Sequence, residues 1–197
     1  NPIQEYSIQI PEDASANVQF SANELQKYIK RATGVELSIV NSVGQGGKVI
    51  ELSPVVSDNL GDEGFIIETK DGNLLITGGA RRGVMYGVSE FLEKYLGWRF
   101  MGEDYLYVYE RENLDVPNGI YDKQVPVLEY RDTHGYQFRN DSDLTRMYTT
   151  KRKVNAHEDR ASINNAQYGF ALGTTWYHAH SFGYQIKQYY IDKFGEY

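Results

Sequence analysis

Residues 61–100 read GDEGFIIETKDGNLLITGGARRGVMYGVSEFLEKYLGWRF, and this stretch decides the expected fold. Its first half contains two short runs of apolar and β-branched residues, at 65–69 and 74–77. Asp71 and Gly72 lie between these runs and can adopt the positive φ angles that a tight hairpin requires. The two runs therefore predict an antiparallel pair of strands.

The second half of the stretch predicts a helix followed by extended chain. Gly78 and Gly79 are expected to break the second strand. Gly97 stands where a left-handed residue closes a helix, and residues 98–100 resume extended structure. Between these points, apolar side chains recur at steps of three and four residues: Val84, Val88, Phe91, Leu92 and Tyr95.

Outside this stretch, the first 120 residues predict more strands and a second helix. An apolar stripe from Val18 to Ala32 predicts a helix that begins near Ser15 and ends at Gly34. Further strands are expected at 5–10, 35–40, 48–53 and 105–109. We therefore expect an α+β fold, a mainly antiparallel β-sheet with two helices packed on one face.

The remaining residues predict a second region. Turn-forming residues 117–119 precede an expected domain boundary, which divides the chain into 1–122 and 123–197. Residues 127–131 are expected to form a strand, and Asp141 or Ser142 is expected to begin a helix that runs to about residue 150. Residues 153–173 are polar and aperiodic, which is typical of a loop.

Composition excludes several classes of function. Twenty Lys and Arg against 27 Asp and Glu give a net charge of -7 without a basic cluster, which argues against nucleic-acid binding. No apolar run approaches the roughly 20 residues of a membrane span. The absence of cysteine rules out disulfides and thiolate metal sites. The chain begins with Asn1, which suggests a processed or engineered N-terminus. We expect a secreted, periplasmic or cell-envelope location.

Several ordered motifs resemble a known family. The accessory domain that precedes the catalytic barrel in several glycoside hydrolase families is similar to the runs ANELQKYIKRATGVELSIV, LGDEGF and LLITGGARRGVMYGVSEFLEKYLGWRF. The resemblance covers about residues 5–120 and extends to α-glucuronidases, β-N-acetylhexosaminidases and a bacterial group known as a domain of unknown function. It implies a carbohydrate partner.

The second region also resembles these enzymes. Residues 126–132, PVLEYRD, are similar to their first barrel strand, and residues 178–197 to a later stretch, although Ser181 replaces the usual Thr and Phe194-Gly195 the usual His-Pro. A barrel of eight βα units needs about 250 residues, and fewer than a third of that number follow residue 122. The resemblance therefore implies a truncated (β/α)8 barrel whose catalytic carboxylates lie beyond Tyr197.

Candidate substrate-binding residues lie at the end of the expected barrel strand. Arg131 could hold a sugar hydroxyl or carboxylate through its fixed donors, Asp132 could orient it, and His134 lies beside them. A structural ion pair explains Arg131 and Asp132 equally well. Trp176, with some of the 17 Tyr residues, offers ring faces on which a sugar could stack.

His178 and His180 lie on one face if their segment is extended, a spacing that metal sites use. No spacing rule supports a third ligand from His134, His157 or Asp132. We therefore favour hydrogen bonds of these histidines to sugar hydroxyls or within the core, and we expect neither a metal nor another cofactor. Four acidic residues could be considered for glycosidase chemistry, which needs two carboxylates about 5 to 10 Å apart. They lie in expected cap and loop positions, and we expect a solvated surface there: Asp141, Asp143, Glu158 and Asp159.

The loop GGARRG at 78–83 carries two arginines near a helix N-terminus, where phosphates bind in other proteins. Its spacing matches neither the dinucleotide fingerprint nor the P-loop. We therefore interpret these glycines as packing residues that allow close approach of helix and sheet.

Together these features predict a non-catalytic fragment of a glycoside hydrolase that acts on complex glycans. The alternatives are a stand-alone carbohydrate-binding module and a metal-dependent hydrolase that uses His178 and His180. Exposed strand edges in a truncated barrel would favour self-association.

Overall fold

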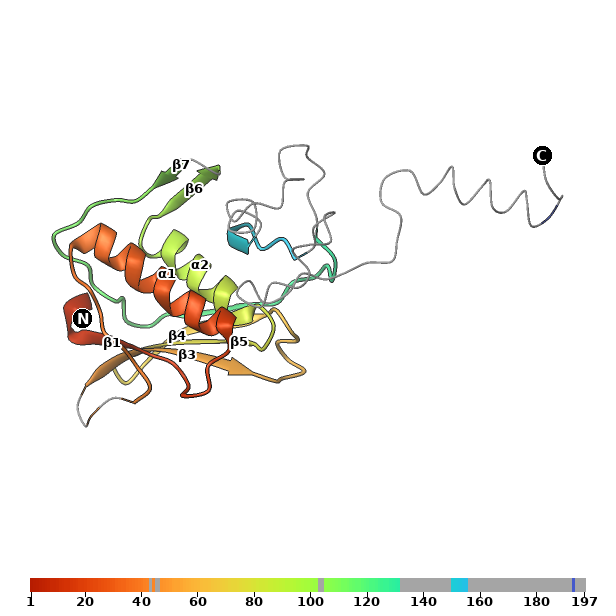
Figure 1. Cartoon of the computed structure of the whole chain (residues 1–197), viewed down its shortest axis with the longest axis horizontal. Helices are drawn as coiled ribbons and strands as arrows, with labels where there is room; N and C mark the ends of the chain where they lie inside the picture. Colours follow the sequence, from red (N-terminus) through yellow and green to blue (C-terminus); the bar gives the residue numbers. More distant parts are fainter. Residues whose placement is uncertain (43, 45–46, 103–104, 132–149, 156–192, 194–197) are drawn as a thin grey trace.

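The computed structural model describes residues 1–42, 44, 47–102, 105–131, 150–155 and 193. Its elements form a sheet layer and a helix layer (Figure 1). In chain order they are a 3-10 helix Ile3–Glu5, β1 Tyr6–Gln9, α1 Ala16–Thr33, β2 Ile39–Val40, β3 Lys48–Val55, β4 Phe65–Lys70, β5 Asn73–Gly79, α2 Gly83–Lys94, β6 Arg99–Gly102, β7 Tyr105–Tyr107 and β8 Tyr121–Gln124.

The main sheet is mixed, with the strand order β2-β1-β3-β5-β4-β8. β4 and β5 form the predicted antiparallel hairpin, with φ angles of 51° at Asp71 and 80° at Gly72. β8 is antiparallel to β4, but β2, β1, β3 and β5 run parallel to one another. The expectation of a mainly antiparallel sheet is thus corrected, because a crossover such as α1 returns the chain to the same end of the sheet.

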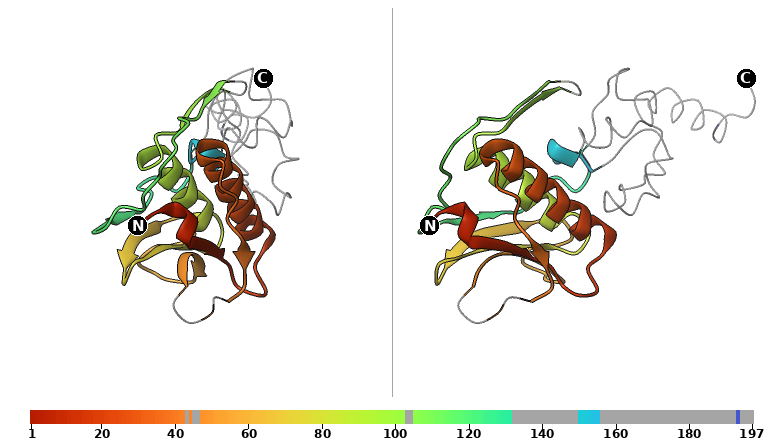
Figure 2. Two further views of the ribbon diagram at one scale, coloured as in Figure 1. Left: turned by 90° about the vertical axis from the view of Figure 1, so that its left-hand side faces the viewer. Right: turned by 60° about the vertical axis from the view of Figure 1, so that its left-hand side comes forward.

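Both helices cover the same face of this sheet, as predicted, and the views in Figure 2 agree. α1 begins directly after Ser15, and Gly34, with a φ of 76°, ends it. The core between the layers combines apolar side chains from helices and strands. Among its fully buried members are Leu25, Ile29, Ile50, Phe65, Ile76 and Phe91. The α+β class with two helices on one face is therefore confirmed.

The glycines of the 78–83 loop allow helix and sheet to approach closely. A Cβ on Gly78 would lie 2.1 Å from the Val84 nitrogen, and one on Gly79 would lie 2.2 Å from the Gly61 oxygen. These distances are shorter than real Cβ contacts, and the obstructing atoms are backbone. The packing interpretation is confirmed, but the two glycines belong to β5 and do not break it.

Three strand predictions need correction. The residues expected to link two domains contain β8, whose polar sequence carries no apolar signal because it is an edge strand. The expected division at residue 122 falls within this strand. Residues 127–131 form no strand, and 35–40 is extended sheet only at Ile39–Val40. The helix expected from 141 or 142 reaches the described residues only at Thr150 and Lys151, which are helical.

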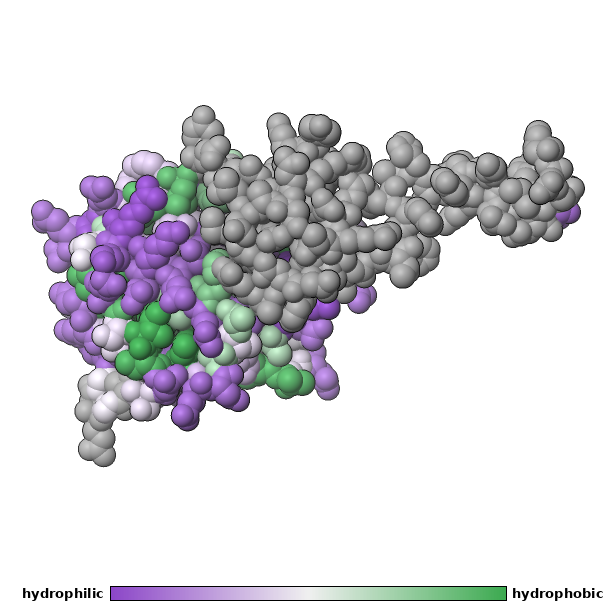
Figure 3. All heavy atoms as spheres, viewed as in Figure 1, coloured by the Kyte–Doolittle hydropathy of each residue, from purple (hydrophilic) through white to green (hydrophobic). Residues whose placement is uncertain are grey.

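The surface of the helical layer is mainly polar. Hydrophilic residues predominate in Figure 3 over the region where α1 lies in Figure 1. In the ranges that the structure describes, no helix has the length and apolar character of a membrane span.

Candidate functional site

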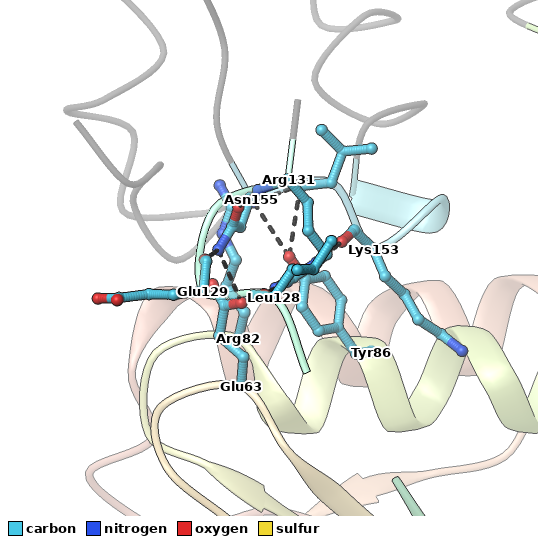
Figure 4. A network of polar contacts seen from close by, with 9 residues as sticks. Glu63, Arg82, Tyr86, Leu128, Glu129, Arg131, Lys153 and Asn155 are labelled. Atoms are coloured by element: carbon cyan, nitrogen blue, oxygen red, sulfur yellow. Dashed lines mark hydrogen bonds and ion pairs between the residues drawn. The ribbon is translucent and has the colours of Figure 1, made fainter. Parts of the chain in front are cut away.

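A polar network joins the chain that follows β8 to the loops around β4 and α2 (Figure 4). Arg131 belongs to it and is the single predicted substrate-binding residue that lies among the described residues. The others lie outside them: Asp132, His134, Trp176, His178 and His180. The acidic candidates Asp141, Asp143, Glu158 and Asp159 and the third-ligand candidate His157 also lie outside them.

Arg131 uses all three guanidinium nitrogens on protein acceptors. Its Nη2 forms an ion pair with Glu63 Oε2. Its Nε donates to the Lys153 carbonyl oxygen at 2.8 Å, and its Nη1 donates to the Leu128 carbonyl oxygen at 2.5 Å. The side chains of Arg131 and Glu63 are 19% and 9% exposed. The structural ion pair that the sequence left open is therefore present, with Glu63 as the partner.

Asn155 ties the same carboxylate to two backbone segments. Its Nδ2 donates to Glu63 Oε2 at 3.0 Å and to the Glu129 carbonyl oxygen at 2.5 Å. Its Oδ1 accepts the Arg131 backbone N–H at 2.8 Å, while its own backbone N–H donates to the Arg131 carbonyl at 3.1 Å. The network thus fixes residues 129–131 against 153–155.

A second group of contacts lies at the beginning of α2. Arg82 is buried, and its Nη1 donates to the Val154 carbonyl oxygen at 2.9 Å and to the Tyr86 hydroxyl at 3.4 Å. Burial raises the pKa of Tyr86, against the opposing effect of Arg82, so the phenol keeps its proton and can donate to the Val154 carbonyl. Arg82 therefore binds a backbone segment that follows the accessory domain.

A pocket of about 410 Å³ lies beside the network. Asp62, Glu63 and Arg81 line one side, and residues 125–129 with Arg131 and Asn155 line the other. Glu63 Oε1 is buried and has no hydrogen-bond partner among the described residues. Within the same residues, no group of three side chains could hold a metal ion. The site offers charged donors and acceptors to a polar group, but its main guanidinium and carboxylate are already paired.

Sequence reasoning missed Glu63, Tyr86 and Asn155. Glu63 lies within LGDEGF, where an acidic residue in the turn before a strand was a usable signal. Asn155 lies in an aperiodic polar stretch that carried no such signal, and its partner Glu63 is 92 residues away.

Comparison with known proteins places the fold. Residues 4–91 match the family model described as the N-terminus of glycosyl hydrolase family 67. The match supports an N-terminal accessory domain of the glycoside hydrolase type over residues 4–91, as the motifs predicted. No curated protein sequence matches the chain at a significant level.

Solved structures agree on the fold. A family GH115 4-O-methyl-α-glucuronidase with specificity for decorated arabinogalactans matches with a TM-score of 0.58 and 12% identity, over 95% of this chain and 33% of its own. A β-hexosaminidase from Streptomyces plicatus, in complex with GlcNAc, matches with a TM-score of 0.51 and 16% identity, over 79% and 30%. The GH20 β-N-acetylhexosaminidase from Streptomyces coelicolor A3(2) matches with 0.50 and 18%, over 66% and 24%. The chain thus spans a third or less of the length of these proteins.

Proposed function

We propose that this chain supplies the accessory domain and the first part of the catalytic region of an enzyme that cleaves complex glycans. The observation that carries the proposal is the family match over residues 4–91, which includes α1, the β4–β5 hairpin and most of α2. In this proposal the chain itself is catalytically silent, because the carboxylates that cleave the glycosidic bond lie in later barrel strands. Its role is to hold the beginning of the catalytic region.

The described contacts support a holding role. Arg82, Glu63 and Tyr86 of the accessory domain all contact the chain between residues 128 and 155. The Glu63 carboxylate and the Arg131 guanidinium are mostly buried, so solvent and salt screen their ion pair less than they screen an exposed pair. Such a contact fixes the position of one region on another better than an exposed pair does.

Uronic-acid substituents are the substrate group that we favour. The motifs resemble α-glucuronidases, and the GH115 structure with the same fold is a 4-O-methyl-α-glucuronidase. Release of a uronic acid from glucuronoxylan tests this assignment directly. We also propose a secreted or cell-envelope location, which cell fractionation would test.

The test compares two proteins on the same substrates. The 197-residue chain, incubated with aryl glycosides and glucuronoxylan, should release no sugar, whereas a longer protein that includes the rest of the barrel should release it. Turnover by the 197-residue chain at an enzyme-like rate would overturn the silent role. A longer protein that is inactive on every glycan tested would count against the enzyme proposal itself.

A stand-alone binding module is the second candidate, and the exposure of two tyrosine rings is the observation in its favour. Tyr107 and Tyr109 are exposed, and their ring centroids lie 4.8 Å apart at an interplanar angle of 86°. This edge-on arrangement is less suited to a flat sugar face than two coplanar rings would be. Calorimetric titration with xylan oligosaccharides, repeated with Trp176→Ala and Tyr109→Ala, distinguishes the candidates, because binding lost in either variant would favour the module.

A further inference from the structure

Lys151 inserts its ammonium group among three aromatic rings of the accessory domain. Its Nζ lies 4.6 Å from the ring centroid of Tyr28, 4.7 Å from that of Trp98 and 5.3 Å from that of Phe100. All three distances are within the range of a cation–π contact. Tyr28 comes from α1, whereas Trp98 and Phe100 lie at the start of the β6–β7 hairpin. Elements far apart in the sequence thus surround one cation.

Two polar partners complete the surroundings of this ammonium. Lys151 Nζ donates to Glu24 Oε2 at 2.7 Å and to the Tyr28 hydroxyl at 3.1 Å. Burial lowers the pKa of Lys151, and the Glu24 carboxylate opposes that shift. Burial and Glu24 both raise the pKa of Tyr28, so the hydroxyl remains neutral. The site therefore provides one carboxylate, one neutral oxygen and three aromatic rings.

The lysine side chain fills this site. It is 5% exposed, and the cavity left beside it, between α1, α2 and Trp98, measures about 10 Å³. That volume holds about one water molecule. Lys27 provides an internal comparison, because it also contacts Glu24, at 3.4 Å, and the Tyr28 ring, at 5.1 Å. Lys27 is 57% exposed and contacts one ring, so enclosure is what distinguishes Lys151.

We propose that Glu24, Tyr28, Trp98 and Phe100 form a binding site for a primary ammonium group, and that Lys151 is its resident ligand. The accessory domain then recognises the region that follows it by the charge and length of one lysine. This inference goes beyond glycan cleavage and does not depend on it, since no sugar enters the argument or the test.

The test removes the ligand and returns it as a small molecule. Lys151→Ala deletes the atoms from Cγ to Nζ, which correspond to n-propylammonium. Hydrogen exchange of residues 150–155 in the full chain should become at least about tenfold faster, because the enclosed cation contacts are lost. Added n-propylammonium chloride should restore much of the protection, whereas 1-propanol at the same concentration should not. Lys27→Ala is the matched control and should change neither exchange nor its response to n-propylammonium.

Two outcomes would overturn the proposal. Equal rescue by 1-propanol would show an apolar cavity without selectivity for charge, and absence of rescue by either compound would show that no ammonium site exists. A measurement on the unmodified chain covers the case in which Lys151→Ala does not fold. With lysines labelled at Cε, the Lys151 CH₂ protons should lie upfield of the other lysines because of the three rings, and their signal is assigned from Lys151→Arg. A spectrum without such a shifted lysine would contradict the enclosure of Lys151 by the three rings.

Discussion

Glu63→Gln tests whether Arg131 is held structurally or is free for a ligand. The substitution keeps the shape of the side chain and an oxygen that can accept from Arg131 and Asn155, but it removes the negative charge. Loss of one partner of a fully buried ion pair costs about 3–5 kcal/mol, and an exposed pair is worth about 0–1 kcal/mol. Arg131 is 19% exposed and keeps two carbonyl acceptors, so the cost should fall between these values. We expect about 2 kcal/mol, or about 30-fold in the opening equilibrium.

Hydrogen exchange of residues 129–131 and 153–155 measures this opening directly. Glu36→Gln is the control, because it breaks the Lys30–Glu36 pair, whose side chains are more than half exposed. It should cost less than about 1 kcal/mol. A double-mutant cycle with Arg131→Met should show a coupling of at least about 1 kcal/mol between Glu63 and Arg131. If Glu63→Gln opens these segments no more than Glu36→Gln does, the structural assignment of Arg131 is wrong.

Three further predictions concern Gly79 in β5 and the ion pair between Lys94 and Asp122. Gly79→Ala should lower the free energy of unfolding by about 3 kcal/mol or more, because its Cβ would meet backbone atoms that cannot rotate away. Gly44→Ala is the control, because the space around its Cβ is open, and it should melt like the parent chain. Equal melting temperatures of the two variants would contradict the packing role of Gly79. Burial acts to raise the pKa of Asp122, but hydrogen bonds, above all from Lys94, lower it below its usual 3.8. The stabilisation by Asp122 should therefore be present above pH 3.8 and disappear as the pH falls through the folded-state pKa. Asp122→Asn should flatten this acid dependence in urea unfolding. If the variant and the parent chain lose stability in parallel as the pH falls, Asp122 does not provide this stabilisation. The same hydrogen bond raises the pKa of Lys94, whose stabilisation should disappear only as the pH rises above 10.5.

Local patterns in the sequence were sufficient for the parts of the fold that local physics determines. Asp71 and Gly72 predicted the hairpin because few residues tolerate their φ angles. Ser15 and Gly34 predicted both ends of α1. Outside this hairpin, strand direction and partners could not be predicted, because alternation of apolar residues has the same period in parallel and antiparallel sheets. β8 was missed since its four residues are polar and exposed on alternate positions.

The candidate site was less predictable, because its contacts join residues that are far apart in the sequence. Arg131 was selected by resemblance to a barrel strand, yet it forms no strand and its ionic partner lies 68 residues earlier. Lys151 and Glu24 are 127 residues apart, in stretches where each reads as an ordinary surface charge. Only the folded arrangement brings such residues into contact, so spacing rules designed for local motifs cannot detect them.

Three acidic side chains of the accessory domain are paired with cations from the chain that follows it. Glu24 on α1 pairs with Lys151, Glu63 before β4 pairs with Arg131, and Glu90 on α2 pairs with Lys153. All three carboxylates are mostly buried. If the following chain moved away, these three ion pairs and the hydrogen bonds that accompany them would be lost together. We therefore expect the stability of the accessory domain and the position of the residues after β8 to be coupled through these three ion pairs.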